Sequence, residues 1–116
     1  MSRPDRAVAE VFFALGDDTR LSVVRRLGRD GSLSATSLSL SARVTRQAIV
    51  KHLQVLEGAG LVRHQKRGRE VLYAINPGRL DDSRTFLDGI SASWDRAIER
   101  LRQLVEQPPG KRRYER

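Results

Sequence analysis

Residues 45–62, TRQAIVKHLQVLEGAGLV, predict an amphipathic helix with two chemically different faces. At 3.6 residues per turn, Ile49, Leu53 and Leu56 fall on one apolar stripe, which suits packing against a protein core. The opposite face is polar and basic, so we expect it to meet another molecule. That face consists of Arg46, Gln47, Val50, Lys51 and Gln54.

The positive charge of the chain is concentrated around this helix. The 116 residues include 22 Lys and Arg but only 14 Asp and Glu, for a net charge of +8 and a pI of about 11.1. Residues 43–69 alone hold seven basic side chains and a single acidic one, Glu57. A polyanion is therefore the expected partner, and nucleic acid is favoured over a membrane surface.

Length and composition exclude several classes of protein. A chain of 116 residues has room for one modest core, which a partner subunit often completes. The absence of cysteine excludes disulfides, thiolate metal ligands and cysteine nucleophiles. No apolar run is long enough for a signal peptide or a membrane span. We therefore expect a cytoplasmic, nucleoid-associated protein without a membrane partner.

Two helices are expected before the central segment. The first covers residues 5–15 and ends at Gly16, with Phe13 pointing away from its apolar face. The second begins after Asp17 or Asp18, either of which can cap it, and ends at Gly28. The apolar faces are Val8, Val11, Phe12 and Leu15 in the first helix, and Leu21, Val24 and Leu27 in the second.

A short helix and a turn lead into the central helix. Residues 34–42, SATSLSLSA, are weak in helix propensity, but they lie between helices and are interpreted as a short helix. The three residues ARV at 42–44 form the turn. Thr45 is placed to cap the next helix by accepting a hydrogen bond from the Ala48 amide, and that helix should end near Gly58 or Gly60.

The hydrophobic period then changes from 3.6 to 2. LVRHQ at 61–65 and VLYAI at 71–75 predict two strands, joined by the basic loop KRGRE. NPGRLDD at 76–82 should break the chain before a long helix over residues 82–106. That helix carries an apolar seam spaced alternately by three and four residues. Residues 1–107 are thus expected to form one domain, and residues 108–116 a basic, disordered tail.

This order of elements predicts a mainly α fold with a small β-hairpin, a winged helix-turn-helix. Arg can bridge guanine O6 and N7, Gln can pair with adenine N6 and N7, and Val can touch a thymine methyl, so the helix at 45–59 should enter a major groove. The wing at 63–75 should contact phosphates or a minor groove. The expected DNA contacts are Thr45, Arg46, Gln47, Val50, Lys51 and Gln54 in the helix, and Lys66, Arg67 and Arg69 in the wing.

The chain also resembles the ArsR/SmtB family of winged helix-turn-helix repressors. The resemblance covers roughly residues 7–105. It is carried by the segments ALGDDTRLSVVRRL and VTRQAIVKHLQVLEGAGLVRHQKRGREVLYAI and by the Trp-bearing last helix. It implies a homodimer joined through the first and last helices, bound to an imperfect palindrome in double-stranded DNA and often repressing its own promoter. Trp94 could alternatively stack on a small ligand. The expected interface is Val8, Phe12, Phe13, Leu87, Ile90, Trp94 and Leu101.

Departures from the family pattern indicate a metal-independent member. Where metal-sensing members carry Cys-x-Cys, this chain has Ser34 and Thr36, and residues 79–107 contain no histidine for the second family site. We therefore expect no metal and no cofactor. Val50 stands where serine is common in the metal-independent branch, and Gly58 where glutamate is common, so an operator sequence cannot be inferred from relatives.

Two function classes remain open from the sequence. The first is a sequence-specific DNA-binding regulator, and the second is a non-enzymatic interaction adaptor built on the same scaffold. An enzyme is not expected, because no nucleophile with a paired base and no phosphate-binding glycine loop is present. No group of residues identifies an effector.

Overall fold

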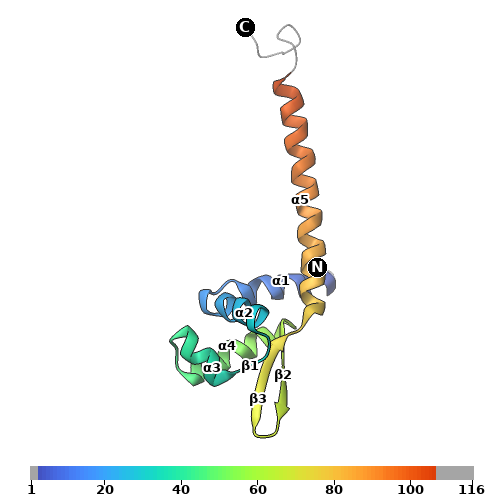
Figure 1. The fold of residues 1–116 in the computed structure, drawn as a ribbon. Helices are drawn as coiled ribbons and strands as arrows, with labels where there is room; N and C mark the ends of the chain where they lie inside the picture. The colour runs from blue at the N-terminus through green and yellow to red at the C-terminus, as the bar shows by residue number, and fades with distance from the viewer. Residues whose placement is uncertain (1–2, 107–116) are drawn as a thin grey trace. The chain divides into compact units, whose positions relative to one another are not determined.

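The computed structural model describes residues 3–106 and has the predicted helical fold with a small antiparallel sheet (Figure 1). The basic segment 108–116 lies outside the described residues. Internal contacts divide the chain into a first unit up to Ser83 and a second unit from Arg84. The elements are α1 (Arg3–Leu15), α2 (Asp18–Asp30), β1 (Leu33–Ser34), α3 (Ala35–Ala42), α4 (Arg46–Gly58), β2 (Val62–Arg67), β3 (Glu70–Ile75) and α5 (Pro77–Val105).

The core of the first unit is built from one face of each helix. Ile49, Leu53 and Leu56 of α4 are fully buried, which confirms the apolar stripe predicted for this helix. Because all three are completely removed from water, α4 is held firmly with its other face outward. The remaining members of the buried cluster are Val11, Ala14, Val23, Leu27, Ala35, Leu38, Ala59, Leu61 and Val62.

Helix α2 differs from its sequence prediction in face and in length. Asp17 caps it, as one of the two predicted alternatives, by accepting a hydrogen bond from the amide of Arg20 at 3.0 Å. The buried residues are Val23 and Leu27, whereas Leu21 is exposed, so the predicted face was partly wrong. The predicted face follows the helical spacing of Leu21, Val24 and Leu27. The core, however, lies on the side of α2 that carries Val23 and Leu27.

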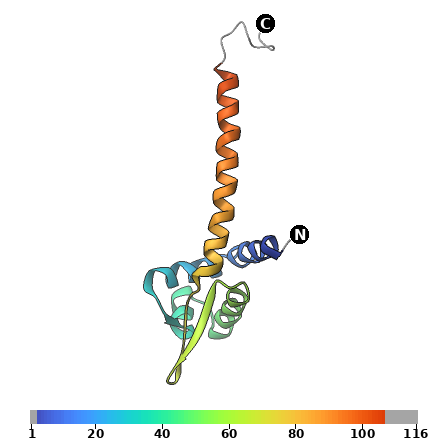
Figure 2. The ribbon, with the colours of Figure 1, turned by 90° about the vertical axis from the view of Figure 1, so that its right-hand side faces the viewer.

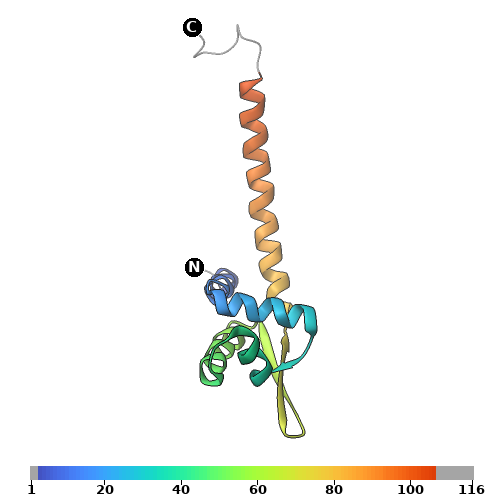
Figure 3. The ribbon, with the colours of Figure 1, turned by 60° about the vertical axis from the view of Figure 1, so that its left-hand side comes forward.

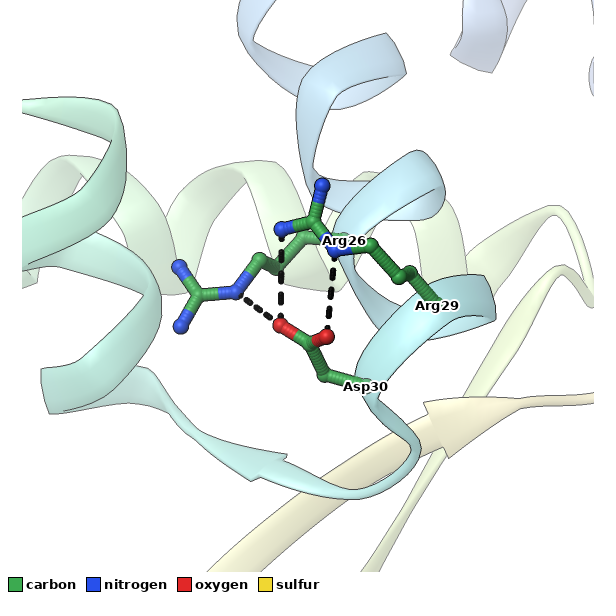
Figure 4. A network of polar contacts seen from close by, with 3 residues as sticks. All are labelled: Arg26, Arg29 and Asp30. Atoms are coloured by element: carbon green, nitrogen blue, oxygen red, sulfur yellow. Dashed lines mark hydrogen bonds and ion pairs between the residues drawn. The ribbon is translucent and has the colours of Figure 1, made fainter.

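The same helix continues beyond Gly28, where it was expected to end. Its last turn is stabilised by Asp30, which accepts hydrogen bonds from Arg26 and Arg29 (Figure 4). These contacts lower the pKa of the Asp30 carboxyl, with the Arg29 hydrogen bond the larger cause. Gly31 then ends the helix with φ of 85° and donates its amide to the Leu27 carbonyl.

Helices α3 and α4 form the helix-turn-helix. The Ser34 hydroxyl caps α3 by accepting from the Ser37 amide at 3.1 Å. The chain turns through Arg43, which has the left-handed φ of 58°. Thr45 then caps α4 by accepting from the Ala48 amide at 3.0 Å, which confirms the predicted start of this helix.

The sheet has three strands in the order β1-β3-β2, one more than the sequence predicted. The additional strand β1 pairs Leu33 with Tyr73, which brings the start of α3 against the hairpin. The hairpin turns at Gly68, whose φ of 60° suits a glycine at the first turn position. Figures 1, 2 and 3 all show this hairpin extending away from the helices of the first unit.

Helix α5 begins at Pro77, so the predicted break over residues 76–82 was wrong. Proline at a first helical position lacks only an amide hydrogen that would have no partner there, and it therefore starts helices well. The described part of the second unit is a single helix up to Val105, followed by Glu106 in a turn. Among the described residues no helix is long and apolar enough to cross a membrane.

Candidate nucleic-acid interface

The outward face of α4 is polar and accessible. Arg46, Gln47, Lys51 and Gln54 are exposed, and they border a shallow hollow of about 410 Å³. Val50 also borders this hollow but is only half-exposed, because it packs against the core. Val50, placed on the outward face by its helical position, therefore has part of its surface covered within the protomer.

Contacts behind α4 fix the direction of this face. Arg20 of α2 donates Nε–H to the Ala14 carbonyl at 2.7 Å, and its Nη1 lies 3.3 Å from Nδ1 of His52 on α4. His52 Nδ1 also lies 3.7 Å from the Asp17 carboxylate. His52 therefore lies against α2 and the end of α1, as a packed histidine on the side of α4 that faces the protein.

Glu57, the one acidic residue of α4, is held in a contact of its own. Oε2 of Glu57 lies 2.7 Å from Nδ1 of His64, at the start of the wing. The His64 ring in turn packs near Tyr73, with ring centroids 5.9 Å apart. Glu57 is thereby paired at the end of α4, and the exposed set on α4 contains no carboxylate.

Three basic side chains surround the tip of the wing. Lys66, Arg67 and Arg69 are all exposed, and none forms an ion pair with a carboxylate in the part of the chain that the structure describes. Arg67 is opposite Glu70 in the strand register, and Arg69 belongs to the turn itself. Their charge is available to an anion outside the protomer.

A cleft separates α4 from the wing, the hairpin formed by β2 and β3. We call it the helix–wing cleft; it encloses about 540 Å³. Arg46 and Arg69 contribute a guanidinium from the helix side and the wing side, and hydroxyl groups come from Ser34, Thr36 and Tyr73. The remaining lining residues are Ala35, Val50, Glu70 and Val71.

The cleft includes the two positions that the family resemblance connects with metal binding, but their chemistry does not fit a soft metal ion. Ser34 uses its hydroxyl to cap α3 and to donate to the Ser37 hydroxyl at 3.2 Å. Thr36 offers only another hydroxyl, which is a poor ligand for zinc, cadmium or arsenite. Within residues 3–106 no three His, Cys, Asp or Glu side chains lie close enough to hold a metal ion.

The proposed interface residues are unevenly exposed. In the first unit, Phe13 is 71% exposed and Phe12 37%, whereas Val8 is only 9% exposed and has little surface left for a partner. Phe13 also lies under the Arg20 guanidinium, 5.6 Å from its ring centroid. In the second unit, Leu87, Ile90, Trp94 and Leu101 are all exposed, and Trp94 is 64% exposed.

Comparison with known proteins agrees with this geometry. Residues 15–65 match the family described as helix-turn-helix domain. The chain is 37% identical over 103 residues to the HTH-type transcriptional regulator Rv2034 of Mycobacterium tuberculosis, covering 89% of each chain. It is 40% identical to a solved ArsR-like transcriptional regulator from Rhodococcus sp. RHA1, with a TM-score of 0.74, covering 89% of this chain and 96% of that one. The chain belongs to the ArsR family of winged helix-turn-helix regulators.

Membership makes this chain a DNA-binding transcription regulator, and the exposed basic surface is consistent with that role. A more distant structure, Mb0332 from Mycobacterium bovis, shares the fold at 21% identity with a TM-score of 0.61, covering 86% of this chain and 93% of that one. That protein is described as a homodimeric winged helix-turn-helix DNA-binding domain of a possible ArsR-family regulator.

Sequence reasoning missed part of the helix–wing cleft. Thr36, Val71 and Tyr73 line it together with Arg46 and Arg69, but none of the three is among the DNA contacts expected from the sequence. They reach the cleft because the two-residue strand β1 pairs with β3. A pair of residues is too short to show a strand period, so the sequence contains no clear signal for this arrangement.

Proposed function

We propose that this ArsR-family protein is a homodimeric repressor, which binds an inverted-repeat operator through α4 and the wing. The observation that carries the proposal is the row of exposed Arg46, Gln47, Lys51 and Gln54 on a helix whose other face is fully buried. A rigid helix with amide and cationic side chains outward suits base-edge contacts in a major groove.

The helix–wing cleft supports a division of the DNA contacts. A helix in the major groove and a wing in the adjacent minor groove must straddle the sugar–phosphate strand that separates the two grooves. Arg46 and Arg69 flank the cleft where that strand would pass, and the Thr36 hydroxyl offers a further donor. The sequence favours base contacts for Arg46 together with Gln47 and Lys51. Because Arg46 borders the cleft, we infer instead that Gln47 and Lys51 read bases, while Arg46, Thr45 and the wing contact the DNA backbone.

The remaining wing side chains suit the outer part of this contact. Lys66, Arg67 and Arg69 surround Gly68 at the tip of an extended hairpin. A minor groove attracts such cations through its negative potential, without presenting a unique pattern of donors and acceptors. The wing therefore adds affinity and salt dependence more than sequence selection.

Dimerisation is supported by the exposed apolar residues and by the homodimeric description of Mb0332. Phe13 on α1 and Trp94 on α5 are large aromatic side chains that a monomer would leave in water. Two copies related by a two-fold axis read two half-sites about 34 Å apart. A dimer bound across a promoter would block RNA polymerase, so repression is the simplest outcome. Such a protein would act at the nucleoid, in the cytoplasm.

Footprinting on the DNA upstream of the protein's own gene tests the proposal. We expect protection of an inverted repeat by the pure protein, with affinity that falls steeply as salt rises. Equal, weak binding to operator and scrambled duplexes would instead favour the adaptor alternative, in which the basic face has no selective DNA contact. Light scattering on the same sample establishes whether the binding species is a dimer.

A further inference from the structure

Among the described residues, the backbone φ is positive at four positions, and three of them are glycines. Gly31, Gly60 and Gly68 have φ of 85°, 80° and 60°. The fourth is Arg43, with φ of 58° and ψ of 40°, in the turn between α3 and α4. A residue with a Cβ is strained in this left-handed conformation, whereas glycine is not. Arg43 therefore stands at a position where glycine would favour folding.

The contacts of the turn require this conformation. The Arg43 amide donates to the Ser39 carbonyl at the end of α3, and the Val44 amide donates to the same carbonyl at 3.2 Å. Val44 packs against the core, and Thr45 follows directly as the cap of α4. Because α3 ends and α4 begins within three residues, the left-handed φ at position 43 is set by the fold, whichever residue stands there.

The Arg43 side chain has no acidic partner in the described protomer. It is exposed and forms no ion pair with a carboxylate in the part of the chain that the structure describes, and residues 31–56 contain no Asp or Glu. Leu40 on α3 stays 76% exposed, so the arginine stem does not cover this apolar neighbour. The remaining role within the protomer is a weak interaction of an exposed cation with the C-terminal end of the α3 dipole.

The turn borders the outward face of α4 on the side away from the wing. Arg43 lies three residues before Arg46, where the exposed row on α4 begins. It is not among the residues that line the helix–wing cleft. Figure 1 shows the turn between α3 and α4 at the end of this helix pair that is remote from the hairpin. The outward face of α4 thus has Arg69 on the side of the wing and Arg43 on the side of the turn.

A helix in a major groove lies between two sugar–phosphate strands. The groove is about 12 Å wide and a helix with its side chains about 10 to 12 Å across, so both strands run close to the sides of the helix. In the proposed arrangement one strand passes through the helix–wing cleft, and the other borders the groove on the opposite side. A phosphate of that second strand would give the Arg43 guanidinium the anion that the protomer does not supply.

We propose that Arg43 binds a backbone phosphate of the DNA strand that lies across the major groove from the helix–wing cleft. The wing and the turn then position α4 from both sides of the groove. This inference rests on the proposed function, because it requires α4 to lie in a major groove. A strained arginine in the turn reduces stability but adds DNA affinity, so losing it changes the two properties in opposite directions.

Thermal unfolding and DNA binding of the full-length Arg43→Gly variant test this opposition. We expect Tm to rise by about 4 °C at equal protein concentration, because glycine removes the strain. Both operator and scrambled duplexes should be bound several-fold more weakly. If each subunit loses one phosphate contact, the slope of log affinity against log salt should decrease by about two for the dimer.

Three further variants separate charge from backbone strain. Arg43→Asn also tolerates a left-handed φ and lacks the charge, so it should reproduce the smaller salt slope. Arg43→Lys keeps both the charge and the strain, and it should restore the slope without raising Tm. Arg25→Gln removes an exposed arginine of α2 and should leave the slope unchanged, which controls for net charge.

Ethylation interference on the operator locates the contact. Arg43→Gly should lose sensitivity to ethylation of a phosphate on one side of the major groove. Arg69→Ala should lose sensitivity at a phosphate on the strand that borders the other side. Loss of sensitivity at the same phosphate in both variants would overturn the assignment of Arg43 to the opposite strand.

The remaining outcomes distinguish this inference from the proposed function. An unchanged salt slope in Arg43→Gly, while the wild type binds the operator selectively, would overturn the phosphate contact and leave the regulator intact. A lower Tm in Arg43→Gly would show that the arginine stabilises the fold, and would overturn the opposition between stability and affinity. Equal binding of operator and scrambled duplexes by the wild type would overturn the proposed function, and this inference with it.

Discussion

Nη1 of Arg20 lies 3.3 Å from Nδ1 of His52, and this contact connects the recognition helix to the junction of α1 and α2. The same guanidinium donates Nε–H to the Ala14 carbonyl at 2.7 Å and lies within 3.4 Å of the Phe13 carbonyl. A side chain outside the proposed DNA-binding surface therefore helps to set the direction of α4. It does so while satisfying carbonyl groups at the end of α1.

Replacing Arg20 should consequently weaken both folding and DNA binding. Arg20→Met keeps much of the aliphatic volume but leaves the Ala14 carbonyl and His52 without their donor. We expect a loss of about 1 kcal/mol in the free energy of unfolding and a several-fold weaker operator affinity. Arg25→Met removes the same charge from an exposed position of α2 and serves as the control. Equal effects of the two changes on operator affinity would show that charge alone matters.

The cap of α4 can be tested without DNA. Thr45→Ala removes the acceptor for the Ala48 amide and should lower the free energy of unfolding by about 1 kcal/mol. Thr45→Ser keeps the hydroxyl and should retain most of that stability. Urea unfolding of both variants measures the difference. If serine and alanine destabilise equally, the hydroxyl does not act as a cap.

The lowered pKa of the Asp17 carboxyl predicts a specific dependence of the protein's stability on pH. The hydrogen bond from the Arg20 amide is the main cause that lowers the pKa of its carboxyl in the folded protein. A lowered folded pKa means that the ionised form stabilises the fold above the ordinary carboxyl pKa of about 4, and that this contribution is lost as pH falls through the lowered value. Asp17→Ala should therefore reduce Tm at pH 7 but much less at pH 2.5. The same reduction at both pH values would contradict this assignment.

Much of the fold could be predicted because several local signals agreed. The Thr45 cap, the Ile49 stripe and the Gly68 turn each have a clear physical signature within a few residues, and the structure confirms all three. Long elements with consistent periodicity are the ones that sequence patterns indicate best. The outward side of α4 follows directly from the buried stripe.

The errors come from contacts that no local pattern records. Leu21 and Val23 are both apolar and point about 200° apart around the helix. Only the packing of the neighbouring elements decides that Val23 is buried. Pro77 indicated a break, yet proline is also a good first residue of a helix. The strand at Leu33 exists because β3 is available to pair with it.

Metal ions and arsenite should leave DNA binding unchanged. Ser34 and Thr36 supply hydroxyl groups where soft ligands would be needed, and the Ser34 hydroxyl already caps α3. Titration of zinc, cadmium or arsenite into the protein–operator complex, followed by fluorescence anisotropy, should show no release at stoichiometric concentrations. If DNA is released and a chelator reverses that release, the protein contains a metal site that the described residues do not form by themselves.

The division of contacts between helix and wing predicts opposite effects for two substitutions. Gln47→Ala removes a side chain from the outward face of α4 and should cost about 1 to 3 kcal/mol on the operator but little on random DNA. Arg67→Ala removes a cation of the wing that has no ion pair within residues 3–106, and it should weaken both duplexes to a similar extent. If each subunit loses one phosphate contact, the slope of log affinity against log salt should decrease by about two for the dimer.

The division of contacts between α4 and the wing is tested most directly by binding isotherms. These compare wild type, Gln47→Ala and Arg67→Ala on operator and scrambled duplexes at several salt concentrations. We expect Gln47→Ala to reduce the ratio of operator to scrambled affinity at an unchanged salt slope. We expect Arg67→Ala to keep that ratio while reducing the slope. The reverse result, with discrimination lost in Arg67→Ala and both affinities lowered equally in Gln47→Ala, would contradict base reading by α4 and backbone contact by the wing.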